Sequence, residues 1–119
     1  MKERLKGEVL NRGRDDIIQF AELVSIARFD LEIAEGPPLV ECVKGCLLDL
    51  LNEGLSVIGD LDESGPRLKV RPSLGSADSI VDRVIQEWHA LGRPPNLAEI
   101  CWIELTDKGR DVARERFGA

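Results

Sequence analysis

Apolar residues recur every three or four positions along much of the chain, a spacing typical of amphipathic helices packed on a core. The pattern predicts helices at residues 15–34, 38–53, 77–91 and 107–117. The first of these has the clearest stripe, which consists of Ile17, Phe20, Ala21, Val24, Ala27 and Leu31. The pattern does not determine the residue at which this helix ends, because residues 29–33 also alternate in polarity as a strand does.

Residues that favour helix ends support these boundaries. Gly54 is a typical residue just beyond a helix C-terminus, so it is expected to end the second helix. Ser76 and Ser79 are alternative N-caps of the third helix, and Thr106 is the expected N-cap of the last. The stop of the first helix is expected at Gly36, before two prolines.

Three short segments read as strands, at residues 55–59, 67–71 and 100–105. In the second, Leu68 and Val70 alternate with three cations, and turn residues separate it from the first strand. The resulting order is α-α-β-β-α-β-α. It predicts an α+β fold: one helix-rich globular domain over residues 14–119 with a small antiparallel sheet. Residues 1–13 show little apolar periodicity and are expected to form a mobile or loosely docked basic arm.

Two stretches resemble parts of bacterial winged-helix proteins. Residues 47–55 are similar to a helix that ends in Glu-Gly-Leu and leads into the first wing strand. Residues 102–110 are similar to the returning strand, with its Leu-Thr-x-x-Gly entry into a terminal helix. The resemblance implies a winged-helix-like domain, with one departure. About forty residues, including a whole helix, lie between the two strands, where winged-helix regulators have a short wing.

Charge is distributed unevenly within a net charge of −6. Residues 1–14 carry five basic and two acidic side chains, whereas residues 15–64 carry two basic and twelve acidic ones. An acidic surface repels phosphate backbones and accelerates encounters with basic proteins. A basic protein is therefore the favoured partner, and nucleic acid is the less favoured one.

Several function classes find no support in the sequence. No apolar run approaches the roughly 20 residues of a membrane span, so no membrane association is expected. The charged N-terminus predicts no signal peptide. The three cysteines, Cys42, Cys46 and Cys101, suit reduced thiols in the cytoplasm, which is the expected location.

Two candidate metal-binding motifs lack ligands that such sites require. Residues 60–65 imitate the start of a calcium loop, but position 12, which needs a bidentate Glu, is Arg71. An acidic hairpin turn is expected instead. Cys42 and Cys46 share one helix face without two further ligands nearby, so they are interpreted as core residues. We expect no metal and no cofactor.

Catalysis is not expected either. His89 is the only histidine, so imidazole chemistry would have to use it. A small enzyme would require Glu87, His89 or the Asp60–Asp62 pair to converge with other groups around a concave pocket. Trp88 and Trp102 stand among aliphatic residues and are interpreted as core.

One candidate interaction patch remains, on the basic strand and the last helix. It comprises Arg67, Lys69, Arg71, Lys108, Arg110 and Arg114. These cations could contact a phosphate backbone, or they could be a solvated face that protects an edge strand from aggregation. The expected function is a non-enzymatic acidic protein-binding module, as an inhibitor or immunity protein would be. The alternative is a winged-helix-like DNA-binding regulator that uses the basic hairpin.

A homodimer is also expected. The helix predicted at residues 15–34 has apolar residues outside its main stripe, among them Ile18, Leu23, Ile26 and Phe29. A helix that is apolar on more than one face is either deeply buried or shared with a second chain.

Overall fold

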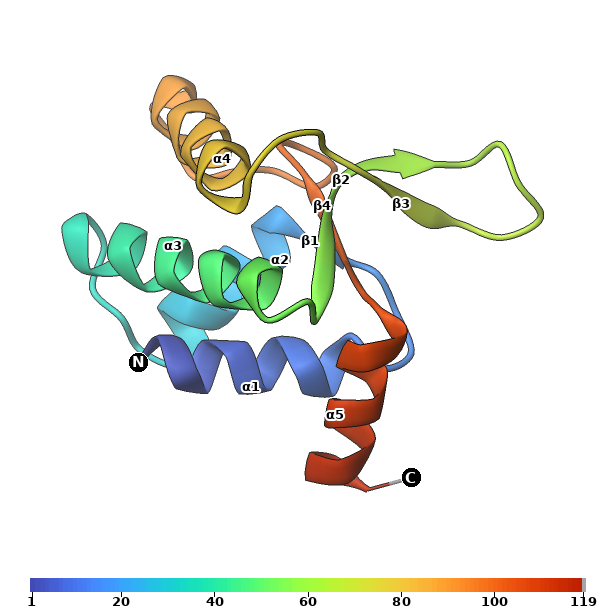
Figure 1. Cartoon of the computed structure of the whole chain (residues 1–119). Helices are drawn as coiled ribbons and strands as arrows, with labels where there is room; N and C mark the ends of the chain where they lie inside the picture. Colours follow the sequence, from blue (N-terminus) through green and yellow to red (C-terminus); the bar gives the residue numbers. More distant parts are fainter. Residues whose placement is uncertain (119) are drawn as a thin grey trace.

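Helices and short strands alternate along the chain in an α+β fold, as the sequence predicts (Figure 1). The computed structural model describes residues 1–118. The elements are α1 (Lys2–Arg12), β1 (Ile18–Gln19), α2 (Phe20–Ser25), the π-helix η1 (Ile26–Asp30), α3 (Pro37–Asn52), β2 (Ser56–Asp62), β3 (Lys69–Pro72), α4 (Ala77–Leu91), β4 (Trp102–Leu105) and α5 (Asp107–Phe117). No helix within residues 1–118 combines the length and the apolar character needed to cross a membrane.

The four strands form one antiparallel sheet in the order β1-β4-β2-β3. Strand β2 changes partners along its length: its first half pairs with β4, and its second half pairs with β3. The second half of β2 and β3 project from the body as a hairpin, which we call the β2–β3 arm (Figure 1). Gly59 stands at the change of partners, opposite both Trp102 and Pro72. A Cβ there would collide with the carbonyl oxygen of Arg71, so the close approach of β3 requires glycine.

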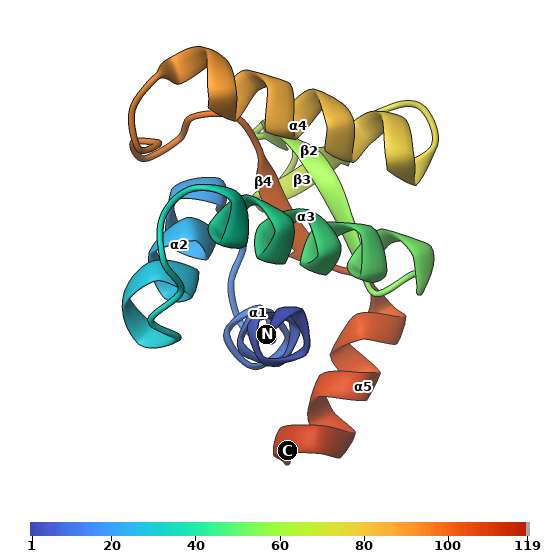
Figure 2. The same ribbon diagram turned by 90° about the vertical axis from the view of Figure 1, so that its left-hand side faces the viewer.

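Helix α3 lies between α1 on one side and α4 on the other (Figure 2). Its apolar stripe supplies the centre of the core, and Val43, Cys46, Leu47 and Leu50 are fully buried. The faces of α3 that meet α1 and α4 are thus covered, whereas Glu41 and Asn52 stay exposed.

Residues 1–13 are not an arm, and that prediction is wrong. They form helix α1, in which Leu5, Val9 and Leu10 are at most 1% exposed. The apolar stripe of α1 is narrow, because charged residues occupy the other faces of the helix. Those cations meet acids of the body: the Lys6 ammonium lies 2.9 Å from a Glu53 carboxylate oxygen, and the Arg12 guanidinium lies 2.6 Å from Asp30.

The single helix predicted for residues 15–34 is also wrong. The segment divides into β1, α2 and η1, because Gln19 is extended and the backbone widens into a π-helix after Ser25. This division buries Ile18, Leu23 and Ile26, which are each at most 2% exposed, whereas Phe29 is 65% exposed. The three buried residues do not require a second copy, and the homodimer stays a prediction.

The remaining helices begin and end where the sequence predicts, within one residue. Ser76 rather than Ser79 caps α4, since its hydroxyl oxygen accepts a hydrogen bond from the Ser79 backbone N–H at 3.1 Å. Thr106 caps α5 in the same way, with Gly109 as the donor. Gly54 follows α3 with a φ of +70°, a left-handed conformation that glycine adopts without strain.

The two stretches that resemble winged-helix proteins lie against each other. The Thr106 hydroxyl donates to the Gly54 carbonyl at 2.6 Å, and the Thr106 backbone N–H donates to Leu55 at 3.0 Å. Gly109 packs on the Leu55 carbonyl so closely that a Cβ would collide with it. These contacts give Gly54, Leu55, Thr106 and Gly109 a structural role at one junction.

Candidate functional site

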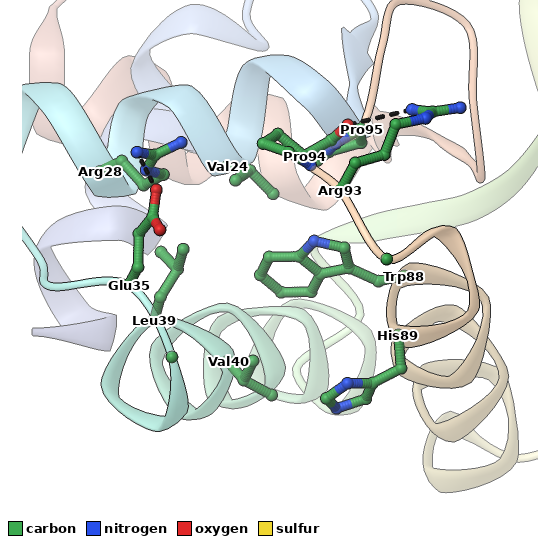
Figure 3. Close-up of a pocket in the computed structure, with 12 residues that line it drawn as sticks. Val24, Arg28, Glu35, Leu39, Val40, Trp88, His89, Arg93, Pro94 and Pro95 are labelled. Atoms are coloured by element: carbon green, nitrogen blue, oxygen red, sulfur yellow. Dashed lines mark hydrogen bonds and ion pairs between the residues drawn. The ribbon is translucent and has the colours of Figure 1, made fainter.

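A concave groove with an apolar floor opens between α2, η1, the start of α3 and the end of α4 (Figure 3). We call it the Trp88 groove, and its volume is about 340 Å³. The apolar residues that line it are Val24, Leu39, Val40, Trp88, Pro94 and Pro95. This volume and composition fall within the range of sites that bind small ligands or short peptide segments.

Trp88 forms the centre of the groove wall. Its ring meets the buried Phe20 ring edge to face, with centroids 5.3 Å apart, and this contact fixes the orientation of the indole. The indole extends from α4 into the space opposite Val24 (Figure 3). Trp88 is therefore half-buried and faces the groove as well as the core, where the sequence indicated a core residue only.

Two arginines at the rim are each held by a carboxylate. Arg28 forms an ion pair with Glu35 and lies over the Phe29 ring. Arg93 donates to both carboxylate oxygens of Glu99, at 2.8 Å each. These hydrogen bonds, together with one from the Asn96 backbone N–H, lower the pKa of Glu99 to about 2. Glu35, which lines the groove, and Glu99, which holds the rim residue Arg93, are thus both paired within the chain.

The backbone on both sides of the groove is irregular. On one side Arg28 belongs to the π-helix η1. On the other, the loop between α4 and β4 holds Ala98 and Ile100 at positive φ, which is strained for a β-branched residue. The Ala98 backbone N–H donates to the Gln19 side chain at 2.6 Å, which fastens this loop to β1. π-Helical turns and strained residues recur at functional sites. Here η1 and the first part of the α4–β4 loop supply lining residues, while Ala98 and Ile100 lie farther along that loop.

Comparisons with protein-family models, curated proteins and solved structures gave no match.

His89 lies at the rim of the Trp88 groove, so the sole histidine does border a concave pocket. Its side chain is exposed, and no hydrogen bond to its imidazole is present within residues 1–118. Glu87, Asp60 and Asp62 do not line this groove. Among residues 1–118, Glu35 supplies the one carboxylate that lines it, and Glu35 is paired with Arg28. The arrangement is suited to binding a ligand and shows no paired acid and base.

The predicted basic patch is divided by the fold. On the arm, Lys69 stands opposite Asp62 and Arg71 stands opposite Asp60, so each of these cations on β3 faces an acid on β2. Lys108 donates to the Glu53 carbonyl at 2.8 Å. The pairing register of a hairpin determines which residues of β2 face which residues of β3. This register could have been used to predict that the acids lie beside the bases.

Two members of the patch, Arg67 and Arg110, do come together in a second cleft of about 440 Å³. Arg14 also lines it, a residue that the sequence analysis did not select. Arg110 and Arg114 border a smaller hollow beside Arg14, and Arg114 is paired with Asp111. Arg67, Arg110 and Arg114 therefore border two clefts that share Arg110, while Lys69 and Arg71 lie on the arm and Lys108 contacts the end of α3.

Glu104 lies at the base of the second cleft with its side chain 11% exposed. One carboxylate oxygen accepts the Val70 backbone N–H at 2.8 Å, and the other lies 3.4 Å from the Arg110 guanidinium. This carboxylate joins the β2–β3 arm to the body. Trp102 lines the same cleft and is half-buried, so it also lies at the edge of the core.

The acidic turn and the cysteines have local structural roles. Asp62 accepts hydrogen bonds from the Ser64 hydroxyl and backbone N–H, which lower the pKa of its carboxyl and close the turn of the arm. The three cysteines are free and buried, and burial raises the pKa of the Cys101 thiol to about 12. Within residues 1–118, no group of three or more His, Cys, Asp or Glu side chains could hold a metal ion.

Proposed function

We propose that the protein is a non-enzymatic protein-binding module that holds a segment of another protein in the Trp88 groove. The observation that carries this proposal is the half-buried Trp88 at the centre of an apolar groove with arginines at its rim. Tryptophan and arginine are the residues most enriched among the strong contacts of protein interfaces. The groove is also held in shape by the Arg28–Glu35 and Arg93–Glu99 pairs, which lowers the entropy lost on binding.

The charge of the molecule supports a basic partner, because a net charge of −6 accelerates association with basic proteins. Part of the acidity is neutralised inside the chain by α1, whose Lys2 and Lys6 pair with Asp49 and Glu53. Asp15 and Asp16 carry no such ion pair within residues 1–118, and both line the second cleft. A role as an inhibitor or an immunity protein remains an analogy from the acidity.

The test compares two variants of the tagged full-length protein as bait in lysate of the source cell. Val40→Asp places a charge on the groove floor, while Leu74→Asp makes the same kind of change at a residue that is 87% exposed and outside the groove. We expect partners that wild type and Leu74→Asp retain and that Val40→Asp loses. Identical sets of bound proteins for all three baits, with Val40→Asp folded by circular dichroism, would contradict the proposal.

A winged-helix-like DNA-binding regulator is the second candidate. It is supported by the sheet order β1-β4-β2, with α2 and α3 between β1 and β2, and by the projecting arm with its three cations. Against it, the arm also carries Asp60, Asp62 and Glu63, and α3 is covered by α1 and α4. A gel shift with random genomic fragments at low salt tests it. Retardation at micromolar protein that Lys69→Glu abolishes would replace the first proposal.

A further inference from the structure

We propose that the segment bound in the Trp88 groove carries an acidic side chain, Asp or Glu, next to apolar ones. This inference rests on the function proposed above and specifies the chemistry of the occupant. The carboxylate would bind the Arg28 guanidinium at the rim, and the apolar side chains would contact Val24, Leu39 and Val40 around the Trp88 ring (Figure 3).

The two arginines that line the groove differ in how many of their N–H groups are already used. Arg93 donates to both carboxylate oxygens of Glu99 and to the Pro94 carbonyl, so most of its guanidinium is occupied. Among residues 1–118, Arg28 pairs with a single carboxylate oxygen, that of Glu35, whereas a guanidinium has five N–H donors. Arg28 is therefore the rim cation with donors available to a ligand.

Arg28 is also held in position before a ligand binds. Its guanidinium lies over the Phe29 ring, 4.8 Å from the ring centroid, and Glu35 holds it from the loop that precedes α3. The Arg28 side chain is 24% exposed, so a ligand can reach it while part of the surrounding water is excluded. A positioned guanidinium matches the geometry of a carboxylate, which can accept two parallel hydrogen bonds from it.

The other free polar groups of the groove also suit a negatively charged acceptor. The Trp88 indole N–H donates to no group among residues 1–118, and it is open to a ligand, because the one side-chain polar atom there that is both buried and unpartnered belongs to Ser56. The His89 imidazole at the rim has an N–H in either protonation state, so it can donate to a carboxylate as well. A basic ligand side chain would find the lining carboxylate of Glu35 already paired with Arg28.

The local charge of the groove differs from that of the whole molecule. Its charged lining residues are Arg28, Arg93 and Glu35, whereas the net charge of the chain is −6. The whole molecule therefore attracts a basic partner over distance, and contact with the groove selects an acidic side chain within that partner.

The first experiment selects peptides without assuming their sequence. A phage library of random dodecapeptides is panned separately on wild type, Val40→Asp and Leu74→Asp. We expect clones that bind wild type and Leu74→Asp but not Val40→Asp, and we expect Asp or Glu beside apolar residues to be enriched among them over the unselected library. Groove-specific clones without this enrichment, or no groove-specific clones at all, would overturn the inference.

The second experiment tests whether the acid of the peptide contacts Arg28. The best groove-specific peptide and its amide counterpart, with Asp replaced by Asn or Glu by Gln, are titrated by calorimetry into wild type, Arg28→Gln and Arg83→Gln. Arg83 is exposed and lies on α4 outside the groove, so its variant is a control that removes the same charge.

We expect wild type and Arg83→Gln to bind the acidic peptide about tenfold or more tightly than the amide peptide, because a hydrogen-bonded charge is lost with the acid. Arg28→Gln should bind the two peptides within about twofold of each other, which is the coupling that a double-mutant cycle detects. Equal affinity of wild type for both peptides, or an undiminished preference for the acid in Arg28→Gln, would overturn the inference.

Replacement of the acid that competes for Arg28 should have the opposite effect. Glu35 is 65% exposed, and Gln keeps an acceptor for Arg28 while it removes the negative charge that repels a ligand carboxylate. Glu35→Gln should therefore bind the acidic peptide about threefold or more tightly than wild type does, with unchanged affinity for the amide peptide. Weaker or unchanged binding of the acidic peptide would contradict the role of Arg28.

The two proposals can fail separately. If Val40→Asp loses cellular partners while the selected peptides carry no acid, the groove binds proteins but its occupant belongs to another class. If Val40→Asp keeps every partner, the groove is not the protein-binding site. Self-association of wild type that Val40→Asp abolishes would identify a second copy of the chain as the occupant and would overturn both proposals.

Discussion

Gly109 has no Cβ, and this allows two parts of the fold to pack closely at one junction. It lies in the first turn of α5, where its backbone N–H donates to Thr106 at 3.1 Å and its Cα rests on the Leu55 carbonyl. The absence of a Cβ lets the end of β4 and the start of β2 lie next to the first turn of α5. The requirement is one of space, because the residue is in an ordinary helical segment and not in the left-handed region.

We predict that Gly109→Ala lowers the free energy of unfolding by about 1–3 kcal/mol, as overpacking of a filled site does. Gly7→Ala is the matched control. Gly7 is also helical, but its Cβ would meet only the flexible end of Arg116, at 3.6 Å. Alanine should there be neutral or stabilise the helix by up to about 1 kcal/mol. Urea unfolding curves of the two variants measure the difference, and equal midpoints would contradict the prediction.

At the scale of elements, the β2–β3 arm depends on a side chain from outside the hairpin. β3 is an edge strand, and its Val70 N–H would lack a partner if Glu104 did not accept it. Val70 is itself buried, so water does not readily replace the carboxylate.

We predict that Glu104→Ala destabilises the protein by about 1–3 kcal/mol, the cost of leaving a buried donor unpaired. Glu104→Gln keeps an acceptor at the same place and should cost less. Amide hydrogen exchange at Val70 measures the effect locally: the rate should rise in Glu104→Ala and stay close to wild type in Glu104→Gln. Unchanged protection of Val70 in the alanine variant would show that Glu104 does not hold the arm.

The loop between α4 and β4 should respond to acid through Glu99. Its pKa is lowered to about 2 in the folded protein by Arg93 and the Asn96 N–H, from an ordinary value of 4.5. A lowered pKa means that the contribution to stability is complete above pH 4.5 and is lost as the pH falls toward 2. NMR titration of the Glu99 carboxyl should give the low midpoint, and amide signals of residues 93–99 should shift with it. Titration of Glu99 near pH 4.5 would contradict the clamp.

The sequence predicted the elements that have both a stripe and end signals. Helices α3, α4 and α5 each have a capping residue or a terminal glycine, and the expected bounds hold within one residue. Helix α1 was missed because its apolar stripe consists only of Leu5 and the adjacent pair Val9 and Leu10, in a segment that is otherwise mostly charged. The π-helix η1 was missed because an irregular turn leaves no distinct period in a segment where apolar residues occupy several faces.

At the scale of the whole molecule, the charge imbalance of the sequence is partly removed by folding. The basic N-terminal residues form α1, and this helix packs on the acidic segment and pairs with Asp30, Asp49 and Glu53. Exposed ion pairs contribute little stability each, so the burial of Leu5, Val9 and Leu10 is the larger effect.

We predict that deletion of residues 1–13 prevents stable folding. Each of the three fully buried side chains contributes about 1.5–3 kcal/mol by burial. Their sum is comparable to the whole stability of a typical domain, roughly 5–15 kcal/mol. Near-ultraviolet circular dichroism and thermal unfolding of the truncated chain check this. A cooperative transition close to that of the full chain would mean that residues 1–13 are dispensable, as an arm would be.

The Trp88 groove could not be predicted from the sequence, although Trp88 and His89 were both examined. Its wall combines residues near positions 24, 28, 35–40 and 88–95, which belong to separate elements. Each of these segments reads as an ordinary helix or loop by itself. Only the packing of α4 against α3 brings them together, and the pattern along a chain does not determine which helices pack on one another.

The pairing of Gly59 with Trp102 also affects how this molecule could vary. The chain leaves the body of the sheet after one of these residues and returns just before the other, so the two ends of the intervening segment are neighbours. That segment contains β3 and α4 and supplies Trp88, while the opposite wall of the groove comes from residues before it. Substitutions at groove-lining residues of this segment would therefore change one wall of the groove, while the wall built by α2, η1 and α3 would keep its sequence.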